Sequence, residues 1–131
     1  MNQNFETIIR SVFEDSAAGS IHFGQVIAQL MAAHVESYQV DYRTGRITCY
    51  RTDGRVVEAG TDALAKTIGD LFDVDALKAA IRGAQEGRVK FPEFKMLSQQ
   101  AGCVGYTVWI VGRHVTYFGR RGETHVEHFP S

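Results

Sequence analysis

An internal repeat constrains the fold of this chain more than any other feature of its sequence. Residues of about 5–58 resemble those of about 73–127, at an offset of 68 that becomes 67 across one loop and reaches 69 at the end. The matching positions include Gly19/Gly87, Phe23/Phe91, Tyr38/Tyr106, Arg46/Arg113, Tyr50/Tyr117 and Glu58/Glu127. Because 131 residues is near the usual size of one domain, we expect two similar units within a single domain.

Each unit opens with the pattern of two amphipathic helices, in which apolar residues recur three and four positions apart. Gly19 and Gly87 follow the first helix of each unit, where a glycine commonly ends a helix. Pro92 is tolerated because it falls in the first turn of its helix. The apolar spacing within residues 59–72 predicts a further short helix between the units. The paired helices are predicted at about 5–18, 23–33, 73–86 and from 91 onward.

Three strands are expected after each helical pair, because the apolar period there changes to alternate residues. The predicted strands are 37–42, 46–51, 55–58, 105–111, 113–118 and 123–129. The fold class is therefore α+β, with two pseudo-symmetric α-α-β-β-β repeats forming one domain. We expect a largely antiparallel sheet of about six strands, covered mainly on one face by helices.

The two long hairpins are expected to pair equivalent tyrosines. In the first, a three-residue loop that ends with Gly45 in the left-handed conformation sets Tyr38 opposite Tyr50. In the second, a shorter two-residue loop sets Tyr106 opposite Tyr117. The prediction is sensitive to register, because a slip of one residue turns every side chain to the other face.

Composition predicts a soluble cytoplasmic protein. The chain is 44% hydrophobic and 22% charged, with a net charge of -1, and no apolar run approaches the roughly 20 residues that span a membrane. Glu6, Arg10 and Glu14 interrupt the apolar pattern of the N-terminal stretch, which excludes a signal peptide there. Cys49 and Cys103 occupy non-equivalent places in the two units, so we expect free thiols.

The second unit resembles a known group of proteins. Its stretch 91–130 is similar to the YdfO/YbcV-like family, small enterobacterial and prophage proteins of unknown function that are often labelled phage envelope protein. The resemblance implies an α+β fold and a prophage-type protein, and it carries over no catalytic residue. The matching elements are Phe91-x-x-Phe94, Ala101-Gly102, Tyr106-x-Val108, Tyr117-x-Gly119, Gly122-Glu123 and Glu127-x-Phe129-Pro130.

Residues repeated in both units form the first candidate site. If the two halves enclose a groove, tyrosine rings would line it and an arginine would receive a small anion. Cross-strand aromatic pairs that only stabilise the sheet are the alternative, and the preferred interpretation. The candidate ligand-binding residues are Tyr38, Arg46, Tyr50, Tyr106, Arg113 and Tyr117.

A metal site is not predicted. His125 and Glu127 would share one face of a strand while His128 points to the other, so only two ligands converge. His114 or Cys49 would have to complete the set. No paired C-x-x-C or H-E-x-x-H spacing is present, and we expect neither a metal nor another cofactor.

Catalysis and nucleic-acid binding receive little support. Cys103 with His114 nearby is a possible nucleophile, but a small buried cysteine is the commoner outcome, and we assign no catalytic residue. A sequence pI of about 6.5 and the lack of a recognised motif argue against a nucleic-acid partner. The local basic patch within 88–121 holds Arg88, Lys90, Lys95, Arg113, Arg120 and Arg121.

The second hairpin is apolar on both faces, which favours an interaction surface. Trp109, Val111 and Phe118 form its extra apolar face, and we expect this face to pack on the first unit in preference to another subunit. The sequence thus predicts a non-enzymatic, prophage-type cytosolic protein that acts through protein–protein interaction or self-association. The alternative is a small-anion or metabolite binder, or an enzyme, that uses the groove between the repeats.

Overall fold

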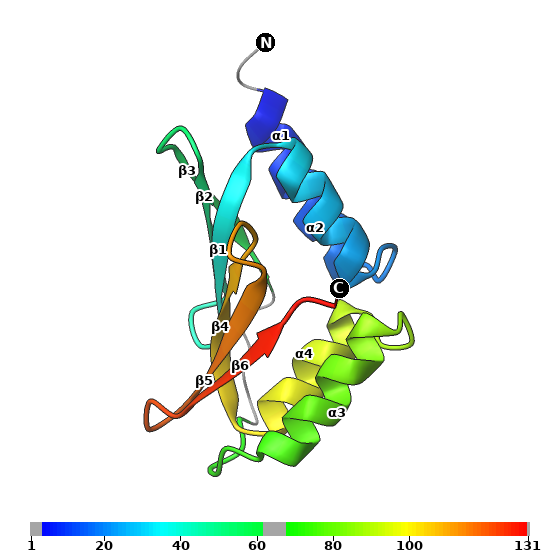
Figure 1. Cartoon of the computed structure of the whole chain (residues 1–131), viewed down its shortest axis with the longest axis vertical. Coiled ribbons are helices and arrows are strands. Elements are labelled where there is room, and N and C mark those ends of the chain that lie inside the picture. Colours follow the sequence, from blue (N-terminus) through cyan, green and yellow to red (C-terminus); the bar gives the residue numbers. More distant parts are fainter. Residues whose placement is uncertain (1–3, 62–67, 131) are drawn as a thin grey trace.

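The computed structural model describes residues 4–61 and 68–130. Within these ranges the chain forms two layers, an antiparallel sheet and a layer of helices on one of its faces (Figure 1). The α+β fold class predicted from the sequence is confirmed. The elements are α1 (Asn4–Ala17), α2 (Phe23–Ala32), β1 (Val35–Asp41), β2 (Arg46–Arg51), β3 (Val56–Gly60), α3 (Val74–Gln85), α4 (Phe91–Gln100), β4 (Cys103–Trp109), β5 (His114–Gly119) and β6 (Thr124–His128).

The sheet has the strand order β3-β2-β1-β4-β5-β6. Its centre is the antiparallel pair of β1 and β4, which joins the first three strands to the last three. The helices α1 and α2 pack on the β1–β3 half, and α3 and α4 lie against the β4–β6 half (Figure 1). The opposite face of the sheet carries no helix from the described residues, as the one-sided cover predicted from the sequence requires.

The predicted helix boundaries are reproduced within a residue or two. The helix α3 begins after Asp73, whose carboxylate accepts a hydrogen bond from the backbone N–H of Ala76 at 3.1 Å. Gly19 and Gly87 follow α1 and α3 with φ angles of 75° and 78°. These left-handed residues end the helices because glycine adopts that conformation at no steric cost.

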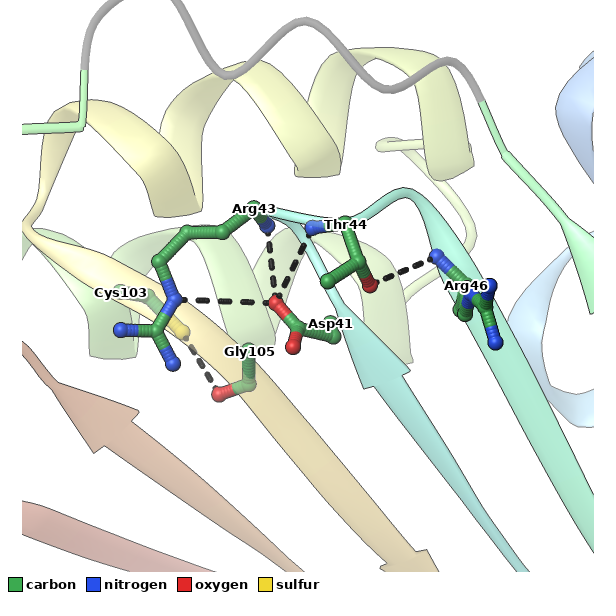
Figure 2. A network of polar contacts seen from close by, with 6 residues as sticks. All are labelled: Asp41, Arg43, Thr44, Arg46, Cys103 and Gly105. Carbon is green, nitrogen blue, oxygen red and sulfur yellow. Dashed lines mark hydrogen bonds and ion pairs between the residues drawn. The ribbon is translucent and has the colours of Figure 1, made fainter.

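The predicted register of the first hairpin is wrong by one residue. Tyr38 pairs with Cys49, and the loop has four residues because Tyr42 leaves the strand. The Asp41 carboxylate accepts hydrogen bonds from the backbone N–H groups of Arg43 and Thr44, at 2.9 and 3.4 Å (Figure 2). The interior holds the ring of Tyr42, which is fully buried.

The predicted register of the second hairpin is confirmed, since Tyr106 pairs with Tyr117. Its ladder ends at Trp109 and His114, which leaves a four-residue loop like that of the first hairpin. The unequal loop lengths expected from the sequence are therefore wrong. The offset of 67 that aligns identical residues around the two loops had misplaced the second strand of the first hairpin by one residue.

Left-handed backbone conformations recur at a constant spacing in the two halves. Eight described residues have positive φ angles, and they form four pairs that are each 68 residues apart. Two pairs combine a glycine with another residue, so the conformation is retained where the side chain differs. The pairs are Gly19/Gly87, His34/Gly102, Gly45/Arg113 and Gly54/Gly122.

The connection between the halves is bound to the end of α4. The N–H of Gly69 donates to the carbonyl oxygen of Gln99, and that of Asp73 donates to the carbonyl of Ala101, both at 2.8 Å. The helix predicted within 59–72 falls largely on residues 62–67, which lie outside the described residues, and it stays a prediction. The described residues 68–72 form an irregular segment beside α4.

Candidate functional site

The face of β4, β5 and β6 that points away from the helices bears no permanent charge. Its side chains alternate along each strand with the buried ones that pack on the helices. Antiparallel sheets that leave one face in water usually place polar and charged residues there. We call this set the outer face: Gly105, Thr107, Trp109, His114, Thr116, Phe118, Thr124, Val126 and His128.

Large apolar side chains on the outer face are open to solvent. Trp109 is 42% exposed and Val126 is 47% exposed, while Val111 in the adjoining loop is 72% exposed. Phe118 is half-buried beside Gly105, where the surface is hollowed. The sequence preferred burial of this face against the first unit, and that prediction is wrong because β1–β3 lie beside β4–β6 in the same sheet.

An aromatic row crosses the outer face near one end of the strands. The His114 ring lies 6.2 Å from that of Trp109 and 5.7 Å from that of His128. The indole N–H of Trp109 donates to the hydroxyl of Thr116 at 3.3 Å, which orients the ring along the sheet. The row therefore presents an aromatic edge without a permanent charge.

The tyrosines predicted to line a groove divide between the two faces. Tyr38, Tyr106 and Tyr117 are buried beneath the helices, with exposed fractions of 3%, 7% and 5%. Tyr106 and Tyr117 have ring centroids 5.5 Å apart. Tyr50 lies on the other side of the sheet and is 39% exposed, because the corrected register turns it away from Tyr38.

The two predicted arginines lie beside different structures. Arg46 lines an open hollow next to α1 and β3, which it shares with Glu14 and Glu58. Arg113 lies over the ring of Phe129, with its guanidinium carbon 5.5 Å from the ring centroid. Neither arginine lines the hollow that contains Tyr106 and Tyr117, so the structure does not gather the six candidate residues.

A pocket that the sequence did not identify lies between the two helical pairs and β4–β6. It opens beside the start of α2 and is walled by α3, α4 and the last three strands. Alternation along β6 predicted that His125 and Glu127 share one face of the strand. It could not predict which helices complete the walls of the pocket. Its aromatic lining residues are Phe23, Phe94, Tyr106, Tyr117 and Phe129.

A hydrogen-bonded histidine–carboxylate pair adjoins this pocket. His125 Nε2 lies 2.8 Å from Glu127 Oε1, and their side chains are only 15% and 27% exposed. The imidazole of His125 stacks on the ring of Tyr117, with centroids 6.4 Å apart. Glu127 lines the pocket, so the pair places a carboxylate beside an aromatic wall.

The possible metal ligands fall into two pairs on opposite faces. His125 stacks on the buried Tyr117 and bonds to Glu127, whereas His114 pairs with His128 across β5 and β6 on the outer face. Within residues 4–61 and 68–130, no group of three histidine, cysteine or acidic side chains is placed to hold a metal ion. Two ligands on either face fall short of a protein zinc site, which takes three or four.

The cysteine thiols are buried, unpaired and protonated. Cys49 and Cys103 are both free and fully buried. Burial raises the pKa of Cys49 to about 12 and that of Cys103 to about 11. A thiolate is the reactive form, so neither side chain is an activated nucleophile.

Native protein is therefore expected to resist alkylation by iodoacetamide at pH 7.5. Both thiols should react once the chain is unfolded in urea, because the unfolded groups regain their ordinary pKa. Intact mass spectrometry before and after unfolding measures the number of labels. Rapid labelling of Cys103 in the folded protein would contradict the assignment.

The basic residues of 88–121 are spread over the molecule. Arg88 pairs with Glu86 at 2.7 Å, and Arg120 donates to the backbone carbonyls of Ile68 and Gly69. They sit in the α3–α4 turn, in α4, in the β4–β5 loop and in the β5–β6 turn. A continuous basic stripe of the kind that binds nucleic acids is not formed by these six residues.

Comparison with known proteins places the chain in a family. Residues 11–127 match a family model described as a protein of unknown function, DUF1398. The chain belongs to the DUF1398 family. This description agrees with the unknown function implied by the sequence resemblance, and it mentions neither prophages nor the YdfO/YbcV-like group.

Curated relatives of this DUF1398 protein are found in mycobacteria. An uncharacterized protein of Mycobacterium bovis and one of Mycobacterium tuberculosis are each 37% identical to it over 84 residues. The match covers 61% of this chain and 50% of each relative. The chain thus spans about half the length of the curated relatives it matches.

Among the described residues, no helix has both the length and the apolar character to cross a membrane.

Proposed function

We propose that this DUF1398 protein is a non-enzymatic protein that self-associates through the outer face. The observation that carries the proposal is a three-stranded surface without Asp, Glu, Lys or Arg, on which Trp109 and Val126 are exposed and Phe118 is half-buried. Exposed apolar patches of this kind commonly mark protein interfaces. Tryptophan is also among the residues that contribute most binding energy when buried in one.

A second copy of the chain is the occupant that fits best. Two-fold symmetry brings the same patch from both subunits together, so a patch with like charges would repel itself. The outer face has no permanent charge, and the whole chain has a net charge of only -1. Stacking of two such sheets would bury the exposed ring of Trp109 and the exposed side chain of Val126 in both copies.

The proposal predicts that Trp109→Asp abolishes self-association. Each copy would bury an unpaired carboxylate in the interface, and we expect the dimer dissociation constant to rise by about 100-fold or more. Sedimentation equilibrium of the wild-type protein over micromolar to submillimolar concentrations should give a dimer, and the variant should be a monomer.

Met96→Asp is the matched control, since Met96 is 48% exposed on α4, away from the outer face. It adds the same charge and should leave the dimer intact. Circular dichroism checks that both variants are folded. A wild-type monomer at submillimolar concentration, or a folded Trp109→Asp dimer, would overturn the proposal.

The finer sequence predictions belong to the same proposal. The constant spacing of 68 between left-handed residues supports a single domain of two duplicated units, at about 5–58 and 73–127. Two unpaired thiols support a reducing, cytoplasmic location. The prophage-type origin rests on the sequence resemblance alone.

A further inference from the structure

The aromatic pocket has the walls of a cation site. Five aromatic rings line it, and they come from α2, α4, β4, β5 and the segment after β6. The faces of aromatic rings carry partial negative charge and attract ammonium groups. Phe23 and Phe129 meet edge to face, with centroids 5.9 Å apart, which closes one side.

The charge in the pocket has the same sign as the ring faces. Glu127 is the one lining residue with an acidic or strongly basic side chain, and no lysine or arginine lines the pocket. The imidazole Nε2 of His125 lies 2.8 Å from Oε1 of Glu127, and this contact holds the carboxylate in place beside the pocket. The guanidinium of Arg113 lies over Phe129 and donates to the carbonyl of Pro130 at 3.4 Å.

The size of the pocket limits the ligand. The hollow, counted with its open mouth, measures about 440 Å³. A ligand of this size can place an ammonium group beside Glu127 and an apolar tail against Ile81 and Ala84 of α3. The amide of Gln85 also lines the pocket and can accept a hydrogen bond from an ammonium N–H.

We propose that this pocket binds a small organic monocation, a primary or methylated alkylammonium, with Glu127 as its counter-ion. The sequence suggested that a groove between the repeats binds a small anion. The arginines that such a ligand requires, Arg46 and Arg113, are not among the residues that line this pocket. The pocket is lined mainly from the helix side of the sheet, and His128 is the one residue of the outer face that also lines it.

Three ligands of one shape and different charge test the proposal. Butylammonium, butanol and butyrate are titrated into the full-length protein at constant ionic strength, and two-dimensional amide NMR spectra are recorded. Butylammonium should cause saturable shifts of the amides of Phe23, Phe94 and Phe129. Butanol should bind at least several-fold more weakly, and butyrate should leave these signals unchanged.

Variants assign the effect to the carboxylate. Glu127→Gln should weaken butylammonium binding about tenfold or more, whereas Glu93→Gln should not change it. Glu93 is exposed, precedes Phe94 in α4 and does not line the pocket. Its substitution by Gln removes the same charge as Glu127→Gln. Dispersed spectra show that each variant is folded. The butylammonium titration runs from 50-fold the protein concentration to about 100 mM. The proposal would be overturned if butylammonium does not saturate the protein in this range. It would also be overturned if butyrate binds equally well, or if Glu127→Gln binds butylammonium as the wild type does. Failure of dimerisation leaves it standing, because the monomeric Trp109→Asp variant retains the pocket.

Discussion

Above about pH 10 the protein is expected to unfold in one steep transition. Six weakly acidic groups are buried between the sheet and the helices, and burial raises the pKa of each. The thiols of Cys49 and Cys103 reach about 12 and about 11. The phenols have pKa values above their ordinary value of 10.0, chiefly through loss of hydration, and they belong to Tyr38, Tyr42, Tyr106 and Tyr117.

The sign of the effect follows from proton release. As pH rises past about 9 to 10, the unfolded chain loses protons that the folded protein retains. The stabilising contribution is fully present below that range and is lost as pH rises through the folded-state pKa values. Each group removes about 1.4 kcal/mol per pH unit. Together the six remove on the order of 10 kcal/mol by about pH 11, which is comparable with the whole stability of a small domain.

Two optical signals measure this transition. Tyrosinate absorbance at 295 nm from the buried phenols should rise together with the loss of far-ultraviolet circular dichroism. The steepness of the transition reports the number of protons released on unfolding. Tyr38→Phe should lower that number by about one of the six. Val108→Ala, at the buried partner of Tyr38 in β4, should lower the midpoint without changing the steepness. Full ionisation of all four phenols in a still-folded protein would contradict their burial.

Local signals in the sequence determined the helices and most strand positions. Asp73 and the glycines after α1 and α3 act on neighbouring backbone groups, so their effect can be predicted without the tertiary fold. The register of the second hairpin was also predictable, because strand alternation placed Tyr106 and Tyr117 on one face.

The register predicted for the first hairpin was wrong because the actual register depends on a distant residue. The hydroxyl of Tyr42 lies 2.7 Å from that of Ser98, and its ring packs edge to face on Tyr106 at 5.9 Å. These contacts pull Tyr42 into the core and lengthen the loop by one residue. Nothing near Tyr42 in the sequence reveals a partner in α4, so the local pattern favoured the shorter loop.

The candidate sites were only partly predictable for the same reason. Trp109, Val111 and Phe118 were identified from alternation within one hairpin, and their exposure depends on how the two halves pair. Side-by-side pairing of β1 and β4 leaves the outer face uncovered, whereas stacking of two sheets would have buried it. The aromatic pocket draws residues from α2 through β6, a combination that requires the assembled fold.

Gly102→Ala is expected to destabilise the fold by about 3 kcal/mol or more. Gly102 has a φ of 89°, a conformation that costs an alanine roughly 1–2 kcal/mol. An added Cβ would also lie 2.8 Å from the carbonyl carbon of Leu71 and 3.1 Å from Cα of Phe72. These are backbone atoms in the segment hydrogen-bonded to the end of α4, so relief requires that segment to move.

Gly87→Ala and Gly122→Ala separate the two causes. Both glycines have positive φ angles, 78° and 82°, and a Cβ at either would meet no atom within 4 Å. They should cost only the conformational part, about 1–2 kcal/mol, in urea unfolding monitored by circular dichroism. An equal loss of stability in all three variants would mean that residues 71–72 move away from α4 at little cost. A larger loss in Gly102→Ala than in the two controls would instead show that residues 71–72 are held firmly against the end of α4.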